Sequence, residues 1–224
     1  MKQITVLLAE DHTVVRQGFR KMLELEDDIE IVGEAQDGRQ AVAMVKKLVP
    51  SVVLMDIAMP LLNGLEATRQ ILKAAPATKV VMLSAHNDDA YVQEATNSGA
   101  VGFLIKQSSA QNVCEAIREV QKGKIFFSVT VARRLQQQNG SPHNRYGARK
   151  QRASLSSREM EVLQLIAEGK ANKESASELG ISIKTVEKHR ENLMSKLNIH
   201  DTAGLTRYAI SAGIIENSVQ VTIV

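Results

Sequence analysis

The sequence predicts an α/β protein, in which an N-terminal doubly wound, five-stranded parallel sheet precedes a C-terminal all-α domain of four helices. Three observations predict this arrangement. Short apolar runs alternate with amphipathic stretches over roughly the first 125 residues, a polar stretch follows, and from residue 155 onward the apolar period is helical. The chain of 224 residues is long enough for two small domains.

Five short apolar runs predict the strands of the sheet. They are continuous rather than alternating, which is typical of strands buried on both faces, so we expect a parallel sheet with helices on each side. The predicted strands are residues 4–9, 29–35, 51–55, 79–83 and 101–105.

Apolar residues three or four positions apart predict a helix after each strand. Pro76 stops the third helix and Gly99 closes the fourth. Ser108 or Ser109 caps the start of the fifth helix, and Gly123 marks its end. The predicted helices are residues 13–25, 38–48, 65–75, 90–98 and 109–122.

The C-terminal part begins after a stretch without apolar period, residues 136–154, which is rich in Gln, Asn, Gly, Ser and Arg and predicts a linker. Ser156 and Glu159 have the spacing of a capping box, and Gly180 separates two further helices. The predicted helices there are residues 157–168, 172–179, 183–197 and 202–212. The predicted division is a first domain at 1–125, a linker with a short helix at 126–154, a second domain at 155–216 and a tail at 217–224.

Composition and charge narrow the class of protein. No apolar run approaches the roughly 20 residues needed to span a bilayer, and the N-terminus lacks the small-residue cleavage site of a signal peptide. The single cysteine, Cys114, fits a reducing compartment, so we expect a cytoplasmic protein without a membrane partner. Residues 1–142 carry 16 basic and 16 acidic side chains, whereas residues 143–200 carry 11 and 7, which favours a polyanionic partner for the second part.

Polar side chains follow four of the predicted strands. Glu10 and Asp11 follow the first strand, Asp56 the third, Ser84 the fourth and Lys106 the fifth. Because the carboxyl ends of parallel strands meet at one edge of the sheet, we expect these five side chains to converge.

Such a cluster suits phosphoryl chemistry. Three carboxylates at one point repel each other and raise their own pKa values, a conflict that Mg²⁺ removes by binding carboxylate and phosphate oxygens. One carboxylate is then left as a nucleophile that accepts a phosphoryl group. A hydroxyl and an ammonium on neighbouring strands would hold the phosphoryl oxygens by charge-assisted hydrogen bonds.

The segments LAEDH, VVLMDIAMPLLNGLEA, VVMLSAHND and GAVGFLIK resemble the receiver domain of two-component response regulators over about residues 3–122, a flavodoxin-like fold. The resemblance implies that Asp56 is the phosphoacceptor. It also implies a Mg²⁺ site, with Glu10, Asp11, Asp56 and the backbone carbonyl of Ala58 as ligands. The phosphate-binding and switch residues would be Ser84, Ala85, Lys106 and Phe103.

Two residues depart from the usual receiver pattern. Glu10 stands where many members have Asp, and it keeps the charge while adding a methylene group. Phe103 stands where Tyr is more frequent, so it lacks a hydroxyl group but can still bury its ring.

Other interpretations of these residues remain open. A lone Asp after a strand is usually a cap or turn residue, a lone Lys is usually a surface residue, and His12 is expected to be structural or solvent-facing. An enzyme of similar fold, such as a haloacid-dehalogenase-like phosphatase using Asp56, would need a DxD-type motif after the first strand, where Glu10 and Asp11 stand. A pseudo-receiver, with an intact pocket but constitutive DNA binding, is a second alternative.

The second domain predicts a helix, a glycine turn and a second helix over residues 172–197, with a mostly basic exposed face on the second helix. The segment from LSSREMEVLQLIAEG to AISAGII, about residues 155–215, closely resembles the LuxR/FixJ-type DNA-binding domain. One departure is Ser175, where the family often has an apolar residue, which should weaken packing modestly. The resemblance implies base contacts by Glu187, Lys188 and Glu191 and phosphate contacts by Lys184, Thr185, His189, Arg190 and Lys196.

Together these features predict a DNA-binding transcriptional response regulator of a two-component phosphorelay, switched by phosphorylation of Asp56. The expected partners are a sensor histidine kinase and double-stranded DNA, which a homodimer would bind through two half-sites; the last helix resembles the dimerisation helix of the family. We expect no enzyme in the ordinary sense, only a phosphoacceptor that catalyses its own phosphorylation and dephosphorylation.

Overall fold

The structure, a computed structural model, describes residues 3–85, 89–127 and 155–215. These residues form two compact units, one within residues 1–150 and one within residues 151–224. The predicted short helix of the linker and the tail from residue 217 lie outside the described residues. No helix among the described residues is long and apolar enough to cross a membrane.

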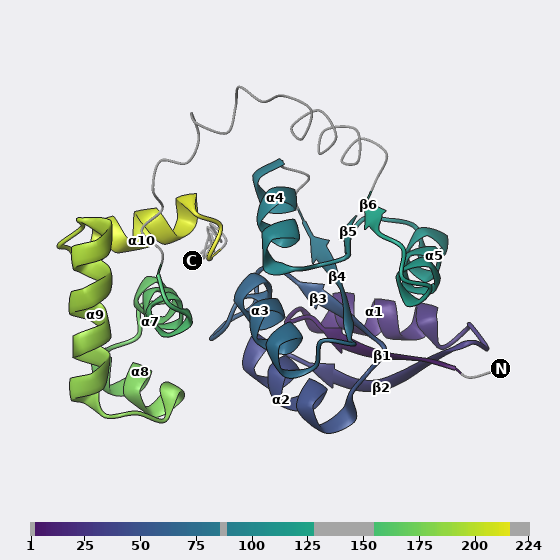
Figure 1. The fold of residues 1–224 in the computed structure, drawn as a ribbon, viewed down its shortest axis with the longest axis horizontal. Helices are drawn as coiled ribbons and strands as arrows, with labels where there is room; N and C mark the ends of the chain where they lie inside the picture. Colours follow the sequence, from purple (N-terminus) through teal and green to yellow (C-terminus); the bar gives the residue numbers. More distant parts are fainter. Residues whose placement is uncertain (1–2, 86–88, 128–154, 216–224) are drawn as a thin grey trace, which may run out of the picture. The chain divides into compact units, whose positions relative to one another are not determined.

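The first unit is a parallel sheet of six strands in the order β2-β1-β3-β4-β5-β6. Five helices alternate with the first five strands, which confirms the predicted doubly wound topology (Figure 1). The strands are β1 (Ile4–Ala9), β2 (Ile29–Ala35), β3 (Val52–Asp56), β4 (Lys79–Ser84), β5 (Gly102–Ile105) and β6 (Phe126–Phe127), and the helices are α1 (Thr13–Leu23), α2 (Gly38–Leu48), α3 (Gly64–Ala74), α4 (Asp89–Ser98) and α5 (Ala110–Gln121).

The sheet is covered on both faces because successive side chains of a strand point to opposite sides. Val6 and Leu8 of β1 pack with α1 and α5, whereas Leu7 and Ala9 pack with α2 and α3. All four side chains are almost completely buried. This double burial explains why the strands appear in the sequence as continuous apolar runs.

The sixth strand was not predicted. Phe126 pairs with Gly102 and Phe127 with Phe103, so residues expected to begin the linker extend the sheet. Two residues are too short to show a period of two. Their pairing gives β5 a neighbour on the side away from β4.

Close backbone packing shapes the loop after β3. A Cβ atom on Gly64 would lie 1.9 Å from the backbone oxygen of Asp56, so only glycine lets the start of α3 approach this strand. The Gly64 N–H donates to the Ile57 carbonyl over 2.8 Å. In the same loop Leu61 has a φ of +65°, a backbone conformation that non-glycine residues rarely adopt. The loop is thus held in one shape beside Asp56.

The second unit contains four helices, as predicted: α7 (Ser157–Ala167), α8 (Asn172–Leu179), α9 (Ile183–Leu197) and α10 (Thr202–Ser211). The Ser156 hydroxyl accepts from the Glu159 N–H and the Glu159 carboxylate accepts from the Ser156 N–H, which confirms the capping box. Gly180, with a φ of +62°, ends α8 and turns the chain into α9. Ser175 is buried, so this unit accommodates the hydroxyl within its core.

Candidate functional site

The polar pocket of the first unit forms where β1, β3 and β5 end. Lys106 follows β5, and its Nζ lies 2.9 Å from Asp56 Oδ2 and 3.0 Å from both carboxylate oxygens of Glu10. Asp56 and Glu10 are each 1% exposed. The predicted convergence of strand-end residues is thus seen directly for two carboxylates and the lysine that contacts both of them.

Buried charge determines the electrostatics of the pocket. Burial, reinforced by repulsion from Glu10 and outweighing the attraction of Lys106, raises the pKa of Asp56 to about 7. For Lys106, burial acts to lower the pKa, but attraction to Asp56 and Glu10 outweighs it and raises the pKa. The pocket therefore holds more negative charge than its single lysine compensates.

Three carboxylate oxygens in this pocket fit a metal ion. Glu10 Oε2, Asp11 Oδ1 and Asp56 Oδ2 are buried and accept no hydrogen bond with good geometry. Glu10, Asp11, His12 and Asp56 each offer one ligand atom, and these four atoms lie within 4.8 Å of one another. Buried carboxylate oxygens in such number are stabilised by a cation, so the cluster is compatible with metal binding.

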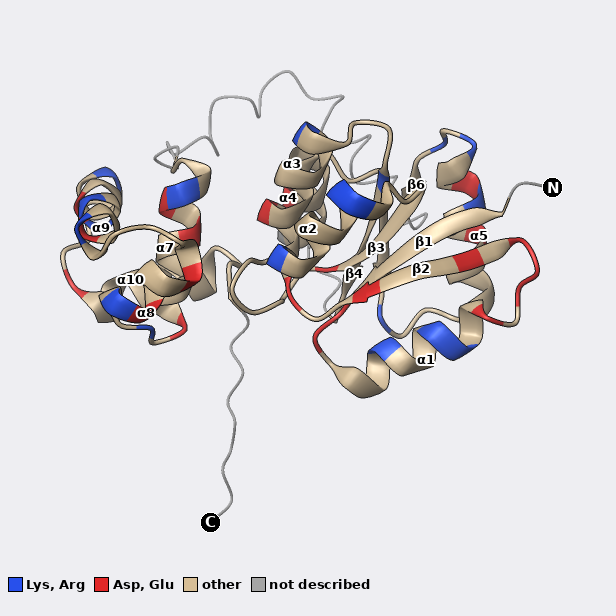
Figure 2. Ribbon diagram, turned by 90° about the horizontal axis from the view of Figure 1, so that it is seen from below, with Lys and Arg blue, Asp and Glu red and all other residues tan. Residues whose placement is uncertain are grey.

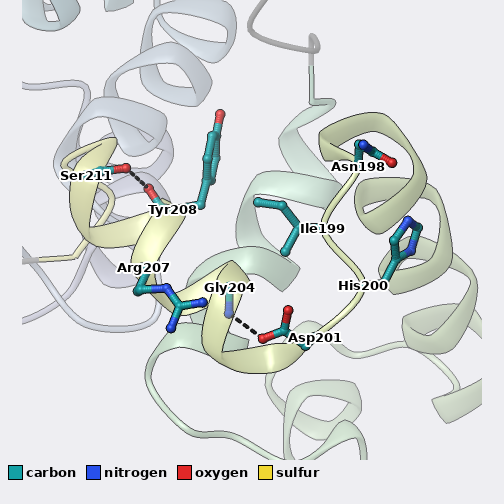
Figure 3. A pocket seen from close by; sticks show the side chains of 8 residues that line it. All are labelled: Asn198, Ile199, His200, Asp201, Gly204, Arg207, Tyr208 and Ser211. Carbon is teal, nitrogen blue, oxygen red and sulfur yellow. Dashed lines mark hydrogen bonds between the residues drawn. The ribbon is translucent and has the colours of Figure 1, made fainter.

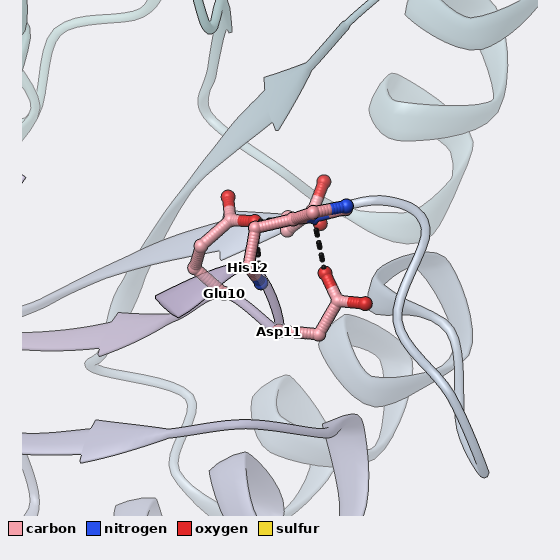
Figure 4. A group of neighbouring side chains, drawn as sticks. Glu10, Asp11 and His12 are labelled. Atoms are coloured by element: carbon pink, nitrogen blue, oxygen red, sulfur yellow. Dashed lines mark hydrogen bonds and ion pairs between the residues drawn. The ribbon is translucent and has the colours of Figure 1, made fainter. Parts of the chain in front are cut away.

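His12, the residue after the acidic pair, turns back onto it. Its Nδ1 lies 2.8 Å from Asp11 Oδ1 and 3.1 Å from Glu10 Oε1, and its backbone N–H donates to Glu10 Oε1 (Figure 4). The side chain of His12 is 62% exposed, which agrees with the prediction that it is structural or solvent-facing, and the contacts with the acidic pair add to that prediction.

Arg16 holds the loop that carries the acidic pair. Its guanidinium group, buried on α1, donates to the backbone carbonyl of Glu10 over 2.7 Å and to the carboxylate of Glu34 over 3.0 Å. The only sequence signal for this role is an arginine on the apolar face of a predicted amphipathic helix. That signal is weak because long basic side chains often lie along such faces.

The remaining predicted pocket residues are placed by their strands. Ser84 ends β4, is buried, and its carbonyl accepts from the Lys106 N–H. Ala85 follows it and is exposed. Phe103 is 2% exposed on β5, so its ring already lies in the core. The N–H of Ala58 lies 3.4 Å from Asp56 Oδ1.

Helix α9 of the second unit presents the face predicted to contact DNA. Val186 and Leu193 are buried in the core, as predicted, while Met194 and Leu197 are half-buried. The exposed residues of the predicted set are Lys184, Thr185, Glu187, Lys188, Glu191 and Lys196. The helix carries both basic and acidic residues (Figure 2).

Two basic residues of α9 have partners within the unit. Lys196 Nζ lies 2.7 Å from Glu159 Oε2 of the α7 capping box. Arg190, half-buried, donates to Thr202 Oγ1 over 2.7 Å and to Asn172 Oδ1 over 3.4 Å. Both side chains therefore tie α9 to neighbouring segments, a role that their basic character alone did not reveal.

A pocket of about 670 Å³ opens where α9 ends and α10 begins (Figure 3). Asp201 caps α10 there by accepting from the Gly204 N–H. None of the predicted DNA-contacting residues lines this pocket, so it is a separate feature of the second unit. Its lining is Asn198, Ile199, His200, Asp201, Gly204, Arg207, Tyr208 and Ser211.

Each of the two units matches a known protein family. Residues 6–118 match the response regulator receiver domain family, and residues 153–209 match the luxR family of bacterial regulatory proteins. The transcriptional regulatory protein LiaR of Bacillus subtilis is 40% identical over 92% of this chain and 96% of its own length. The chain belongs to the response regulators. It is a DNA-binding transcriptional regulator of two-component type, with a receiver domain and a LuxR-type helix-turn-helix domain.

Other relatives support this membership over nearly the full length of the regulator. The response regulator protein VraR of Staphylococcus aureus is 36% identical over 95% of this chain and 99% of its own. Among solved structures, the RcsB response regulator of Salmonella typhimurium is 28% identical over 95% of this chain and 99% of its own, with a TM-score of 0.61. A structure of an RcsB–DNA complex matches with 29% identity, 94% and 99% coverage, and a TM-score of 0.57.

Membership also decides against the phosphatase alternative. Residues 6–118 match the receiver domain family, and Glu10 and Asp11 stand after β1, where such a phosphatase would need a DxD-type motif. The protein is thus a transcription regulator and not an ordinary enzyme.

Proposed function

We propose that Asp56 is the phosphoacceptor of this response regulator and that phosphorylation there controls DNA binding. The observation that carries the proposal is the 2.9 Å contact between Lys106 Nζ and Asp56 Oδ2 inside a buried pocket. An oxygen of Asp56 would attack the phosphorus of a kinase phosphohistidine, the P–N bond would break, and its electron pair would return to the histidine ring. Lys106 and Ser84 would then hold the phosphoryl oxygens, while Ala85 leaves room for them.

The same proposal assigns the pocket to Mg²⁺, held by Glu10, Asp11, Asp56 and the carbonyl of Ala58. The bound ion supplies positive charge that stabilises ionised Asp56 and the incoming phosphoryl oxygens. Support comes from the buried carboxylate oxygens that accept no hydrogen bond. With these groups in place, the regulator would also catalyse its own phosphorylation from a small phosphodonor and its own dephosphorylation.

Phosphorylation would reach the second unit through Ser84 and Phe103. A phosphoryl group on Asp56 would attract the Ser84 hydroxyl, and Phe103 would be held inward, as it already is in this structure. We take residues 1–125, with β6 attached, as the receiver, and residues 155–216 as the DNA-binding domain. A homodimer would then place two copies of α9 in successive major grooves. Because chromosomal DNA is the partner, we assign the protein to the cytoplasm.

On DNA, we propose that Glu187, Lys188 and Glu191 contact bases and that Lys184, Thr185 and His189 contact phosphates. All but His189 are exposed on α9. Arg190 and Lys196 were assigned to phosphates as well, but their contacts with Thr202 and Glu159 favour structural roles for both residues.

Labelling and DNA binding test the proposal together. Acetyl phosphate with Mg²⁺ should phosphorylate the wild type and the Asp27→Asn control, which removes an exposed carboxylate, but not Asp56→Asn. Equal labelling of all three proteins would reject Asp56 as the acceptor. Operator fragments, identified by genome-wide binding, should bind more tightly after phosphorylation; equal affinity with and without it would indicate a pseudo-receiver.

A further inference from the structure

We infer that His12 is an additional metal ligand of the receiver pocket and that it shifts the preference of the pocket from Mg²⁺ toward divalent ions that favour nitrogen ligands. The inference rests on the proposed function, because it concerns the same pocket. The proposed Mg²⁺ site uses oxygen ligands alone. An imidazole nitrogen changes the chemistry of that set, since imidazole suits zinc, nickel, copper and iron better than magnesium.

The separations around His12 fit adjacent ligands of one ion. His12 Nδ1 lies 2.8 Å from Asp11 Oδ1 and 3.1 Å from Glu10 Oε1. Two neighbouring ligands of an octahedral ion, each about 2.1 Å from the metal, are about 3.0 Å apart. Figure 4 shows the three side chains facing one another.

Hydrogen bonding alone accounts poorly for this arrangement. An imidazole Nδ1 carries at most one hydrogen, so it can donate to only one of the two carboxylate oxygens beside it. His12 Nδ1 lies within hydrogen-bond distance of Glu10 Oε1, which also accepts from the His12 backbone N–H and from Lys106 Nζ. Asp11 Oδ1 accepts no hydrogen bond with good geometry despite its nearness to the ring. A cation between these atoms would bind the ring nitrogen and, at the same time, the carboxylate oxygen of Asp11 that accepts no hydrogen bond.

The number of ligands also suits such an ion. Glu10, Asp11, Asp56, the Ala58 carbonyl and His12 would supply five ligand atoms. An octahedral ion would keep its sixth position for a phosphoryl oxygen. The exposed side chain of His12 leaves its ring room to adjust toward the ion. Metal binding through His12 is therefore compatible with phosphorylation of Asp56.

Titration calorimetry of the full-length protein with Mg²⁺ and with Ni²⁺ tests the preference. His12→Gln should weaken Ni²⁺ binding by about tenfold or more, the size of effect seen when a metal site loses a supporting group, and should leave Mg²⁺ affinity within about threefold. The matched control is His200→Gln, which removes an exposed histidine of the second unit and should change neither affinity. Equal loss for both ions, or no loss for Ni²⁺, would overturn the inference.

Electron spin-echo envelope modulation of the Mn²⁺-loaded protein tests the ligand directly. Coupling to ¹⁴N of an imidazole should appear in the wild type and in His200→Gln and should vanish in His12→Gln. If Mn²⁺ binds in an Asp56-dependent manner without that coupling, the inference fails and the proposed function stands. If no divalent ion binds in a manner that depends on Asp56, both fail.

Discussion

Lys106 Nζ lies 2.9 Å from Asp56 Oδ2, although the two residues are 50 positions apart and belong to the ends of different strands. The contact places the lysine on a carboxylate that is 1% exposed. A buried ion pair of this kind gains only part of what it loses in desolvation. The electrostatic cost that remains should be measurable in the metal-free protein.

Replacing Asp56 by asparagine should stabilise the metal-free protein above neutral pH. Burial, then repulsion from Glu10, raises the pKa of Asp56 to about 7 in the folded state, whereas an unfolded aspartate has a pKa of about 3.9. Between these values the folded state binds more protons, so the free energy of unfolding of the wild type falls as pH rises from about 4 to about 7. Thermal unfolding in EDTA should give Asp56→Asn a higher melting temperature than the wild type at pH 8, and this difference in melting temperature should shrink toward pH 5. For Asp27→Asn, the difference from the wild type should not change with pH in this way.

Arg16→Ala should destabilise the receiver. The substitution leaves the Glu10 carbonyl without its donor and Glu34 without one of its arginine partners, at a cost of about 3 kcal/mol in the free energy of unfolding, as for other broken buried pairs. Urea denaturation provides the measurement. Arg20→Ala is the matched control because Arg20 also contacts Glu34 but is exposed, so its loss should be much smaller. If both variants lose the same free energy of unfolding, the contacts of Arg16 with backbone carbonyls contribute nothing to the stability of the receiver.

Gly64→Ala should damage both stability and the pocket. The added Cβ would meet the Asp56 backbone oxygen at 1.9 Å, so β3 or α3 must move, at a cost of about 1–3 kcal/mol. Phosphorylation of Asp56 should slow as well, because the strain falls on the acceptor. Gly18→Ala on α1 meets nothing within 4 Å and should stabilise its helix by about 0.5–1 kcal/mol. Thermal unfolding and acetyl phosphate labelling measure the two effects, and an undisturbed Gly64→Ala variant would contradict the close approach.

Lys188→Ala should lower the affinity for DNA but not the stability, whereas Lys196→Ala should lower the stability but not the affinity for DNA. Lys188 is exposed on α9, so its loss should weaken binding to operator DNA while leaving thermal stability nearly unchanged. Lys196 holds Glu159. Burial acts to raise the pKa of Glu159, but the hydrogen bonds from Lys196 and Ser156 together outweigh burial and lower this pKa. Loss of Lys196 should cost about 1 kcal/mol of stability, a modest figure for a half-exposed lysine, and change DNA affinity little. Fluorescence anisotropy measures the affinity of each variant for operator DNA, with Lys47→Ala in the receiver as the control. If Lys196→Ala loses more affinity than Lys188→Ala, Lys196 contacts a phosphate after all.

The sequence predicted the topology well because buried parallel strands and amphipathic helices leave distinct periods. It also placed Glu10, Asp56 and Lys106 at one edge, since parallel strands end together. It missed β6, whose two residues show no period. It did not predict the contacts of Arg16 and His12 with backbone carbonyls and neighbouring carboxylates, because these contacts depend on how a side chain turns. The phosphate contact of Lys196 was carried over from the resemblance to the LuxR/FixJ-type domain, and the resemblance does not reveal that Lys196 has a buried partner on α7.

The pairing of Phe127 with Phe103 has a consequence for how a signal leaves the receiver. Strand β6, which is paired with β5, is the last described element of the receiver before the connection to the helix-turn-helix domain. A shift of the β5 backbone that accompanies movement of the Phe103 ring should therefore also move β6. We therefore expect a change at Phe103 to leave the receiver through the pairing of β5 with β6, because Phe126 and Phe127 would move together with the β5 backbone.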